Sequence, residues 1–430
     1  MDNLINYIIN LLAHFPVSES GIVHYGKVEN ALNNTKIVII PAFPNFEIIN
    51  LPEIPFIQLD NTPILFGDAR VEKQNNKIII HADIIASSFF LLSRYEEILK
   101  PECRDQHGRF CAKYSIIFQQ GYGNRPLVDE YSLLFRKWLR EAGLNIPAEK
   151  EGFSKIYLTH DVDIPFRFER FYTEFKQQIK NMLHYHYRPS SLKIYFNEKY
   201  DDYYTFPKII NYDKTLRESL PEVPVESIYF LITAGSLFNR KYYNFLSKRI
   251  SRLISLLKTS GAKLGLHVSY EAGINPEEIK YEAKRLINKL KLTNIISRHH
   301  YLQWREPEDV LFMEQAGISD DFTLSYADSV GFRVGTCRPY RFINPRTKEL
   351  TNVMIHPLEI MECTLNRQNY MNLDYENALN ICKEIIRQVF KHNGELVLLW
   401  HNTEFIGMNY QEKLYDVVLE YIKCRKREYL

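Results

Sequence analysis

The segment KIYLTHDVD, residues 155–163, decides the fold, because an apolar strand pattern in it runs directly into closely spaced ionisable residues. Two later segments repeat this arrangement: residues 264–266 lead into His267, and residues 396–400 lead into His401. In parallel α/β architectures the active site lies at the carboxyl ends of the strands. The three segments therefore predict one shared site that contains both carboxylates and imidazoles.

Strand and helix patterns alternate over the chain from about residue 153 onward. This alternation predicts an α/β barrel or a doubly wound sheet with parallel strands. Residues 170–225 interrupt the pattern with an aromatic and charged stretch, which we interpret as an insertion; its His184 and His186 receive no chemical role. We expect strands at 155–159, 227–233, 263–268, 322–326, 331–334 and 395–400, and helices at 241–259, at 276–290, from 307 and at 375–392.

The first third of the chain has its own pattern. It begins with an amphipathic helix, and short apolar runs predict strands at 22–25, 36–40, 63–66 and 77–80. Asp83 is a predicted N-cap for a helix that reaches about residue 98, and a second helix is expected at about 128–142. The polar segment 144–152, with its Pro and Gly, predicts a boundary between a domain at 1–147 and another at 148–430.

Composition excludes several classes of protein. The 54 Lys and Arg residues nearly balance the 52 Asp and Glu residues, so no strong positive field is available for nucleic acid. No stretch approaches the roughly 20 apolar residues of a membrane span. The start lacks the basic region of a secretory signal, so we expect a cytoplasmic protein. The sequence does not fix the oligomeric state.

Asp161 and Asp163 are two residues apart, so on extended backbone both carboxylates point to the same face. Two carboxylates this close repel each other unless a cation neutralises them. Two imidazoles and one carboxylate suit a hydrolytic zinc-type centre. His267 is the first candidate imidazole, and the second comes from His299 or His300. These adjacent histidines face opposite ways on extended backbone, so we expect only one of them to be a ligand.

These residues resemble the polysaccharide deacetylases of the NodB-homology family, carbohydrate esterases of family 4, over residues of about 153–405. That family opens with Thr-Phe-Asp-Asp-Gly, and residues 159–163, Thr-His-Asp-Val-Asp, stand in its place. Its second motif, His-(Ser/Thr)-x-x-His, keeps only the first histidine here, at 267. Its closing Leu-x-x-His motif is similar to residues 398–401. The first third resembles an accessory module, with Ser-Arg-Tyr-Glu-Glu at 93–97 as its most distinctive string, and nothing in it suggests catalysis.

The resemblance implies a fold and a set of roles. The fold is α/β, a distorted (β/α) barrel of the NodB-homology type preceded by a smaller α/β domain. The implied roles make Asp161 the general base and His401 the general acid. Arg333 or Arg338, from two candidates for the third motif, would orient Asp161. The implied ligands of one divalent metal ion, zinc being the first choice, are Asp163, His267, His300 and, as second choice to His300, His299.

The implied reaction removes an N-acetyl or O-acetyl group from a sugar, an oligosaccharide or a polysaccharide precursor. A cytoplasmic enzyme would suit a nucleotide-linked or lipid-linked carbohydrate better than a finished polymer. The 29 tyrosines suit a sugar-binding site, although tyrosines also fill half-buried barrel positions.

Two alternative functions stay open. One is a degenerate barrel that binds glycan, or supports surface-polysaccharide assembly, without hydrolysis, because two metal positions of the family are altered. The other is a glycosidase that uses Asp161 with a second carboxylate, such as Glu359 or Glu362. Bound metal and released acetate discriminate among the three.

Overall fold

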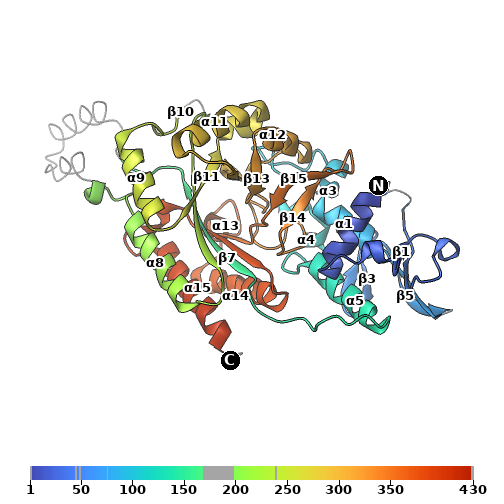
Figure 1. Ribbon diagram of the computed structural model, residues 1–430. Helices are drawn as coiled ribbons and strands as arrows, with labels where there is room; N and C mark the ends of the chain where they lie inside the picture. The colour runs from blue at the N-terminus through green and yellow to red at the C-terminus, as the bar shows by residue number, and fades with distance from the viewer. Residues whose placement is uncertain are drawn as a thin grey trace, which may run out of the picture.

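The computed structural model describes residues 2–43, 46–47, 50–74, 76–167, 198–237 and 240–427, and it shows a mixed α/β chain (Figure 1). Its largest sheet has nine strands, all parallel to their neighbours except β14, which is antiparallel to β15. In spatial order the strands are β14 (Tyr340–Ile343), β15 (Leu350–Ile355), β13 (Ile318–Asp321), β12 (Ile295–His299), β11 (Lys263–Val268), β8 (Val225–Leu231), β7 (Lys155–Val162), β17 (Glu395–Leu399) and β16 (Ile360–Met361).

The sheet is curled, because side chains from distant strands meet across its inner face. Arg298 on β12 donates to Thr159 on β7 at 2.7 Å, although β11 and β8 separate these strands. His356, which follows β15, contacts Asp320 on β13 and Glu395 on β17. The inner face is filled by Tyr157, Ile228, Phe230, Leu302, Phe322, Leu358, Met361, Cys363, Val397 and Leu399.

The predicted mixed α/β architecture is confirmed. The strand pairings of the described residues leave β14 and β16 as two unjoined edges, so hydrogen bonds do not close this sheet into a barrel. The carboxyl ends of β7, β11, β12 and β17 are brought to one end of the curl, as expected for parallel strands.

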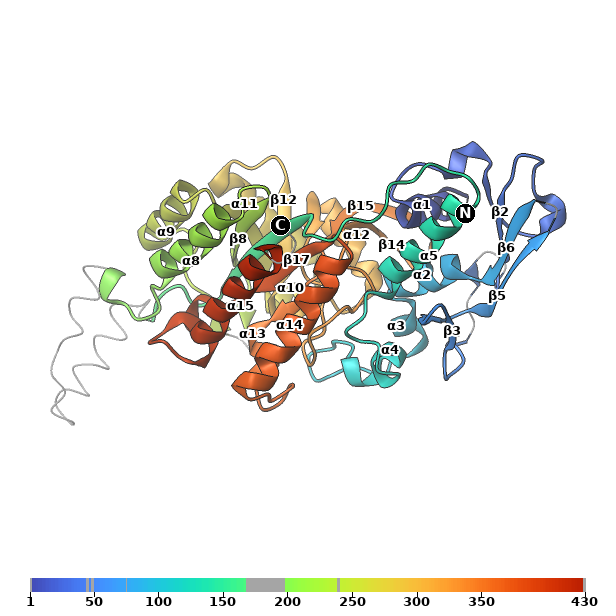
Figure 2. The ribbon, with the colours of Figure 1, turned by 90° about the horizontal axis from the view of Figure 1, so that it is seen from below.

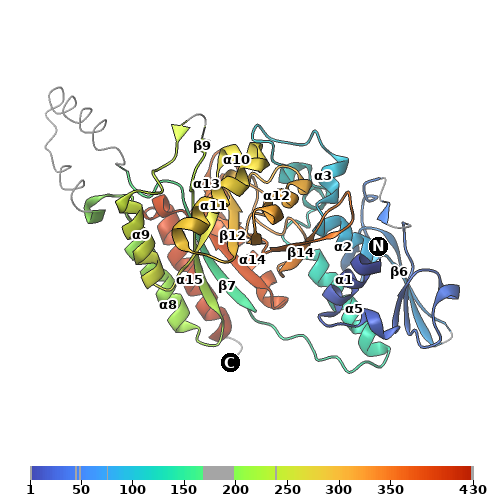
Figure 3. The same ribbon diagram turned by 45° about the horizontal axis from the view of Figure 1, so that its top comes forward.

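Amphipathic helices cover the outside of the curled sheet (Figures 1, 2 and 3). In α9 (Lys248–Thr259), for example, Ile250, Leu253, Ile254 and Leu257 are buried, which is the i, i+3, i+4, i+7 pattern of a single apolar face. The other long helices of this layer are α8 (Phe206–Ser219), α11 (Ile279–Leu290), α14 (Tyr375–Lys391) and α15 (Tyr410–Arg427). No helix in the described part of the chain combines the length and the apolar composition that crossing a bilayer requires.

Several predicted boundaries were wrong. The helix expected at 241–259 begins only at Lys248, because the Ser247 side chain accepts from the Ile250 N–H and caps it there. The strand expected at 322–326 ends at Asp321, whose carboxylate accepts from the Thr323 N–H and turns the chain. Residues 331–334 form a turn and not a strand. Of the expected insertion, α8 is observed, whereas His184 and His186 lie outside the described residues.

The first third forms a four-stranded sheet with helices on the face toward β14 (Figure 2). Asp83 caps α2 as predicted, accepting from the Ala86 N–H, but the expected helix breaks at Arg94, whose φ of 59° is left-handed. The strands are β1 (Val23–Tyr25), β2 (Ile37–Ile39), β6 (Lys77–Ala82) and β5 (Gly67–Gln74), beside a hairpin of β3 (Ile57–Leu59) and β4 (Thr62–Ile64). The helices are α1 (Asp2–Ala13), α2 (Ile84–Leu92), α3 (Tyr95–Leu99), α4 (Ile116–Gln119) and α5 (Leu127–Glu141).

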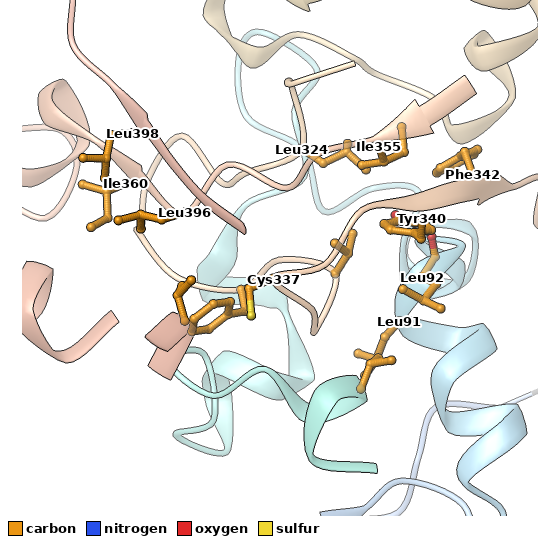
Figure 4. Close-up of a cluster of buried hydrophobic side chains, with 14 of the residues drawn as sticks. Leu91, Leu92, Leu324, Cys337, Tyr340, Phe342, Ile355, Ile360, Leu396 and Leu398 are labelled. Atoms are coloured by element: carbon orange, nitrogen blue, oxygen red, sulfur yellow. The ribbon is translucent and has the colours of Figure 1, made fainter. Parts of the chain in front are cut away.

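A continuous apolar core joins the first third to the large sheet. Figure 4 shows Leu91 and Leu92 of α2 next to Tyr340 of β14, and the Tyr340 hydroxyl donates to the Leu92 carbonyl at 2.9 Å. One cluster of buried side chains contains residues from both parts of the chain. The division into domains at 147 and 148 therefore stays a prediction, and any such domains share a packed interface.

A buried ion network reinforces this interface and explains the string at 93–97. Glu97 accepts from the Arg94 side chain at 2.9 and 2.7 Å and from the Arg333 side chain at 2.7 Å. Arg94 also donates to the Trp304 carbonyl at 3.0 Å. Burial alone would raise the pKa of Glu97, but Arg333 and Arg94 lower it to about 2. Glu97 is thus a buried anion with cationic partners from both parts of the chain.

Replacing Glu97 with glutamine is expected to destabilise the fold by about 3 kcal/mol at neutral pH, because two arginines lose their buried counterion. A carboxyl group with a lowered pKa in the folded state stabilises the fold above its unfolded pKa. The difference between wild type and variant should therefore shrink as pH falls from about 4.5 toward about 2. Urea unfolding at several pH values measures it. Glu29→Gln, at an exposed surface pair, is the matched control; equal effects of both variants would contradict the assignment.

Candidate functional site

Alternation along β7 brings both predicted aspartates to the inner face of the curl. Asp161 and Asp163 point inward with Tyr157, whereas His160 points outward and contacts Asp213 on α8. The same alternation along β17 and the two residues that follow it turns His401 inward. The predicted acids and imidazoles therefore meet, as the strand-end argument expected.

Asp163, His267 and His300 form a compact group of potential metal ligands. Asp163 Oδ1 lies 3.1 Å from His267 Nε2, and Asp163 Oδ2 lies 3.2 Å from His300 Nε2. Asp163 Oδ1 and His267 Nε2 are buried, and apart from each other neither atom has a hydrogen-bond partner among the described residues. Two ligand atoms of one tetrahedral zinc ion are about 3.4 Å apart, given bonds of about 2.1 Å. The residues present thus fit a divalent ion in both chemistry and spacing.

Neighbouring groups orient the two imidazoles so that Nε2 faces the aspartate. His267 Nδ1 lies 2.9 Å from the Arg298 carbonyl oxygen, which can only accept, so Nδ1 donates a proton to it and Nε2 is the nitrogen that could bind an ion. His300 Nδ1 lies 2.7 Å from the Tyr242 hydroxyl, which also accepts from the Tyr270 N–H. Fixing the distal ring nitrogen in this way is how proteins commonly orient metal-binding histidines.

The members of this group shift the pKa values of one another. Burial would raise the pKa of Asp163, but His300 and His267 hold it well below its usual range. Burial would lower the pKa of His267, and Asp161 and Asp163 raise it instead. For His300 burial prevails, and its pKa is lowered. Asp163 is therefore held as an anion by its imidazole neighbours.

His299 faces away from this group. Its backbone N–H and ring Nδ1 lie 3.0 and 3.3 Å from the Thr323 hydroxyl, and its ring stacks against Trp304. Burial lowers the pKa of His299 to about 3. Of the two adjacent histidines, only His300 lies with Asp163 and His267.

The arginine that contacts Asp161 is Arg298, not Arg333 or Arg338. Arg298 is fully buried, and its Nη1 lies 3.1 Å from Asp161 Oδ1. Arg333 instead pairs with Glu97, and Arg338 donates to the His392 carbonyl and lies 3.7 Å from Asp129. Arg298 is two residues before His300 on extended backbone, so alternation along β12 could have identified it had that strand been predicted.

His401 also lies close to Asp163, with its Nε2 3.6 Å from Asp163 Oδ2. Its Nδ1 forms a hydrogen bond with Glu362, whose carboxylate also accepts from the His401 N–H at 3.1 Å. Burial alone would lower the pKa of His401, but Glu362 outweighs it and raises the pKa to about 10. The sequence suggested Glu362 only as part of a glycosidase pair, and its contact with His401 was missed.

A cavity of about 220 Å³ opens onto these groups. Arg109, from the first third, lines it, so that part of the chain reaches the site even though it carries no motif that suggests catalysis. Glu359 does not line this cavity and accepts instead from the Val397 N–H. The other lining residues are Asp161, Asp163, Ile164, Leu237, Tyr242, His300, Tyr301, Leu302, Met361, Cys363, Arg367, Tyr370 and His401.

A second group with metal-ligand chemistry, Glu362, Cys363 and His401, lies beside the first. Glu362 and His401 Nδ1 are engaged with each other, and burial raises the pKa of the Cys363 thiol well above its usual value. A neutral thiol is a poor metal ligand. Asp163, His267 and His300 are therefore the better-suited group.

Comparisons with known proteins add the following. A family of unknown function, DUF7033, matches residues 5–144. No curated protein matches the chain. Among solved structures, the chain is similar to a crystal structure described as that of a "putative polysaccharide deacetylase" from Mycobacterium smegmatis. The two chains are 13% identical, the match covers 64% of this chain and 86% of the other, and the TM-score is 0.40.

Proposed function

We propose that the protein is a metal-dependent hydrolase that removes an N-acetyl or O-acetyl group from a carbohydrate. In this proposal residues 148–430 form a distorted (β/α) barrel of the deacetylase type, and residues 1–147 form an N-terminal domain packed against it. The observation that supports it most is that Asp161 and His401 lie next to the group of Asp163, His267 and His300, and that Asp161, Asp163, His300 and His401 line one cavity.

Asp163, His267 and His300 would hold the ion, with their nitrogen and oxygen atoms already converging. When bound, a divalent ion supplies positive charge that polarises an acyl carbonyl and makes water easier to deprotonate. Three protein ligands leave a position open for the substrate, as catalytic zinc sites do.

Asp161 is suited to accept the proton of the attacking water. Arg298, whose Nη1 lies 3.1 Å from Asp161 Oδ1, and the inward position on β7 fix its carboxylate. Asp161 Oδ2 lies 3.5 Å from His267 Nε2, so the base stands directly beside the proposed ligands. A base held this close to the reacting water contributes about 10² to 10⁴ in rate.

His401 is suited to deliver a proton to the departing amine or alcohol. Hydrogen bonding of Nδ1 to Glu362 fixes the ring and keeps Nε2 protonated and near Asp163. Glu362 acts through His401 and is a positioning residue. The base and the acid therefore both lie next to the proposed ligands, the base 3.5 Å from His267 Nε2 and the acid 3.6 Å from Asp163 Oδ2.

The test is to measure metal content together with acetate release. Purified protein is expected to hold about one divalent ion per chain and to release acetate from N-acetylated or O-acetylated sugars. Removal of the ion with a chelator should abolish release, and added Zn²⁺ should restore it. A protein that holds the ion and binds glycan without releasing acetate would instead be a binding or assembly protein. Cleavage of the glycosidic bond would favour the glycosidase alternative.

A further inference from the structure

Two guanidinium groups lie in the wall of the cavity above the proposed metal ligands. Arg109 comes from the loop between α3 and α4 in the first third of the chain, and Arg367 directly follows α13 (Glu362–Asn366). The deacetylation chemistry proposed above uses neither of them. Their presence in the wall raises the question of what each cation contacts.

Arg109 is nearly saturated by protein partners. Its side chain pairs with Asp105 at 2.6 Å and donates to the Tyr301 carbonyl at 2.7 Å and to the Tyr370 hydroxyl at 3.2 Å. Asp105 neutralises the charge of Arg109, whose contribution is therefore to fix the two tyrosines. Because the Tyr370 oxygen accepts from Arg109, the Tyr370 proton stays available for a ligand in the cavity.

Arg367 differs, because its guanidinium forms no hydrogen bond or ion pair with any residue that the structure describes. The side chain is exposed and lines the cavity beside Tyr370. Asp161 and Asp163 are the acids in the cavity wall, and each already has cationic or imidazole partners. Cys363, Glu362, Tyr370 and Glu404 lie near enough to raise the pKa of Arg367, but none of them forms a hydrogen bond or ion pair with its guanidinium. The guanidinium N–H donors of Arg367 are thus left for a ligand.

We propose, on the basis of the deacetylase function above, that the substrate carries an anionic group recognised by Arg367 and the Tyr370 hydroxyl. A guanidinium fork binds carboxylate and phosphate oxygens with two parallel hydrogen bonds, which a neutral sugar hydroxyl cannot match. A cavity of about 220 Å³ is small for a ligand site, so the anion belongs to the acetylated sugar itself or is directly attached to it. The anion is a carboxylate on the sugar or a phosphate linked to it.

The test compares three ligands: N-acetylglucosamine, its 6-carboxyl uronic acid counterpart and its 1-phosphate. Binding is measured by calorimetry on metal-replete Asp161→Asn protein, which separates recognition from hydrolysis, and acetate release is measured on wild type. At least one anionic ligand should bind about tenfold or more tightly than the neutral sugar. The anionic ligand that binds more tightly identifies the carboxylate or the phosphate as the source.

Arg367→Gln, made in the same background, should weaken anionic binding at least about tenfold more than it weakens neutral binding. Arg387→Gln, at an exposed arginine of α14, is the matched control and should change neither. Equal affinity for neutral and anionic sugars, equal losses in Arg367→Gln, or no binding of any of the three would overturn the inference. Arg367-dependent anion preference without acetate release from any sugar would support it and overturn the proposed reaction instead.

Discussion

Replacing His300 with glutamine is expected to lower the affinity for Zn²⁺ by at least about a hundredfold. His300 Nε2 lies 3.2 Å from Asp163 Oδ2, and its Nδ1 is held by Tyr242, so the variant removes one of three converging ligands. Even changes to residues that only orient a ligand cost about 10- to 100-fold in metal affinity. Calorimetric titration of the metal-stripped protein with Zn²⁺ measures the loss.

His299→Gln provides a control that is matched in chemistry and in position along the chain. His299 is as buried as His300, but it faces Thr323 and Trp304. Its replacement should leave Zn²⁺ affinity within about threefold of wild type. Thermal unfolding of both variants, measured without metal, separates a loss of ligand from a loss of structure. If His299→Gln lost the ion and His300→Gln retained it, the assignment of the ligands would be reversed.

Replacing Asp161 with asparagine is expected to reduce acetate release by about 10² to 10⁴ while the protein keeps its ion. The variant preserves the shape of the side chain but cannot accept the proton of the attacking water. Because Asp163, His267 and His300 are unchanged, metal content should stay near one per chain. Steady-state kinetics and metal analysis on the same preparation test both statements.

Asp202→Asn, at an exposed pair with Arg167, is the control for this substitution and should leave both readouts unchanged. Loss of the ion in Asp161→Asn would show that Asp161 is a ligand. Unchanged turnover with the ion in place would mean that another group accepts the proton.

The strand that carries the site was predictable because period-two alternation is a local property. In KIYLTHDVD it places Asp161 and Asp163 on the face shared with Tyr157, and the structure has them there. The same rule predicts that His299 and His300 face opposite ways, and in the structure His300 lies beside Asp163 whereas His299 contacts Thr323. Parallel strand topology then brings the ends of separate strands together, which the order of strands and helices already indicated.

The features that could not be predicted from the sequence depend on contacts between segments that are far apart along the chain. The helix that begins after Asp83 breaks at Arg94, because the Arg94 side chain donates to Glu97 and to the carbonyl oxygen of Trp304. Trp304 is 210 positions further along the chain. The prediction that Arg333 or Arg338 contacts Asp161 was wrong for the same reason. Arg333 pairs with Glu97 and Arg338 with Asp129, and both acids belong to the first third of the chain. The partner that the structure has, Arg298, lies on a strand that was not predicted.

The part played by the first third was also hidden from the sequence. Arg109 lies in a loop without a recognisable motif, and only folding places its side chain against Tyr301 and Tyr370 in the wall of the cavity. Arg109 holds other side chains in position, and a residue with that role has no local sequence pattern that periodicity or spacing could detect.

Asp163, His267 and His300 are expected to share one metal ion. Anomalous diffraction from a crystal of the zinc-replete protein, recorded on both sides of the zinc absorption edge, tests it most directly. One peak is expected between Asp163, His267 and His300, at about 2.0 to 2.2 Å from each ligand atom. No peak there, or a peak among Glu362, Cys363 and His401 instead, would contradict it.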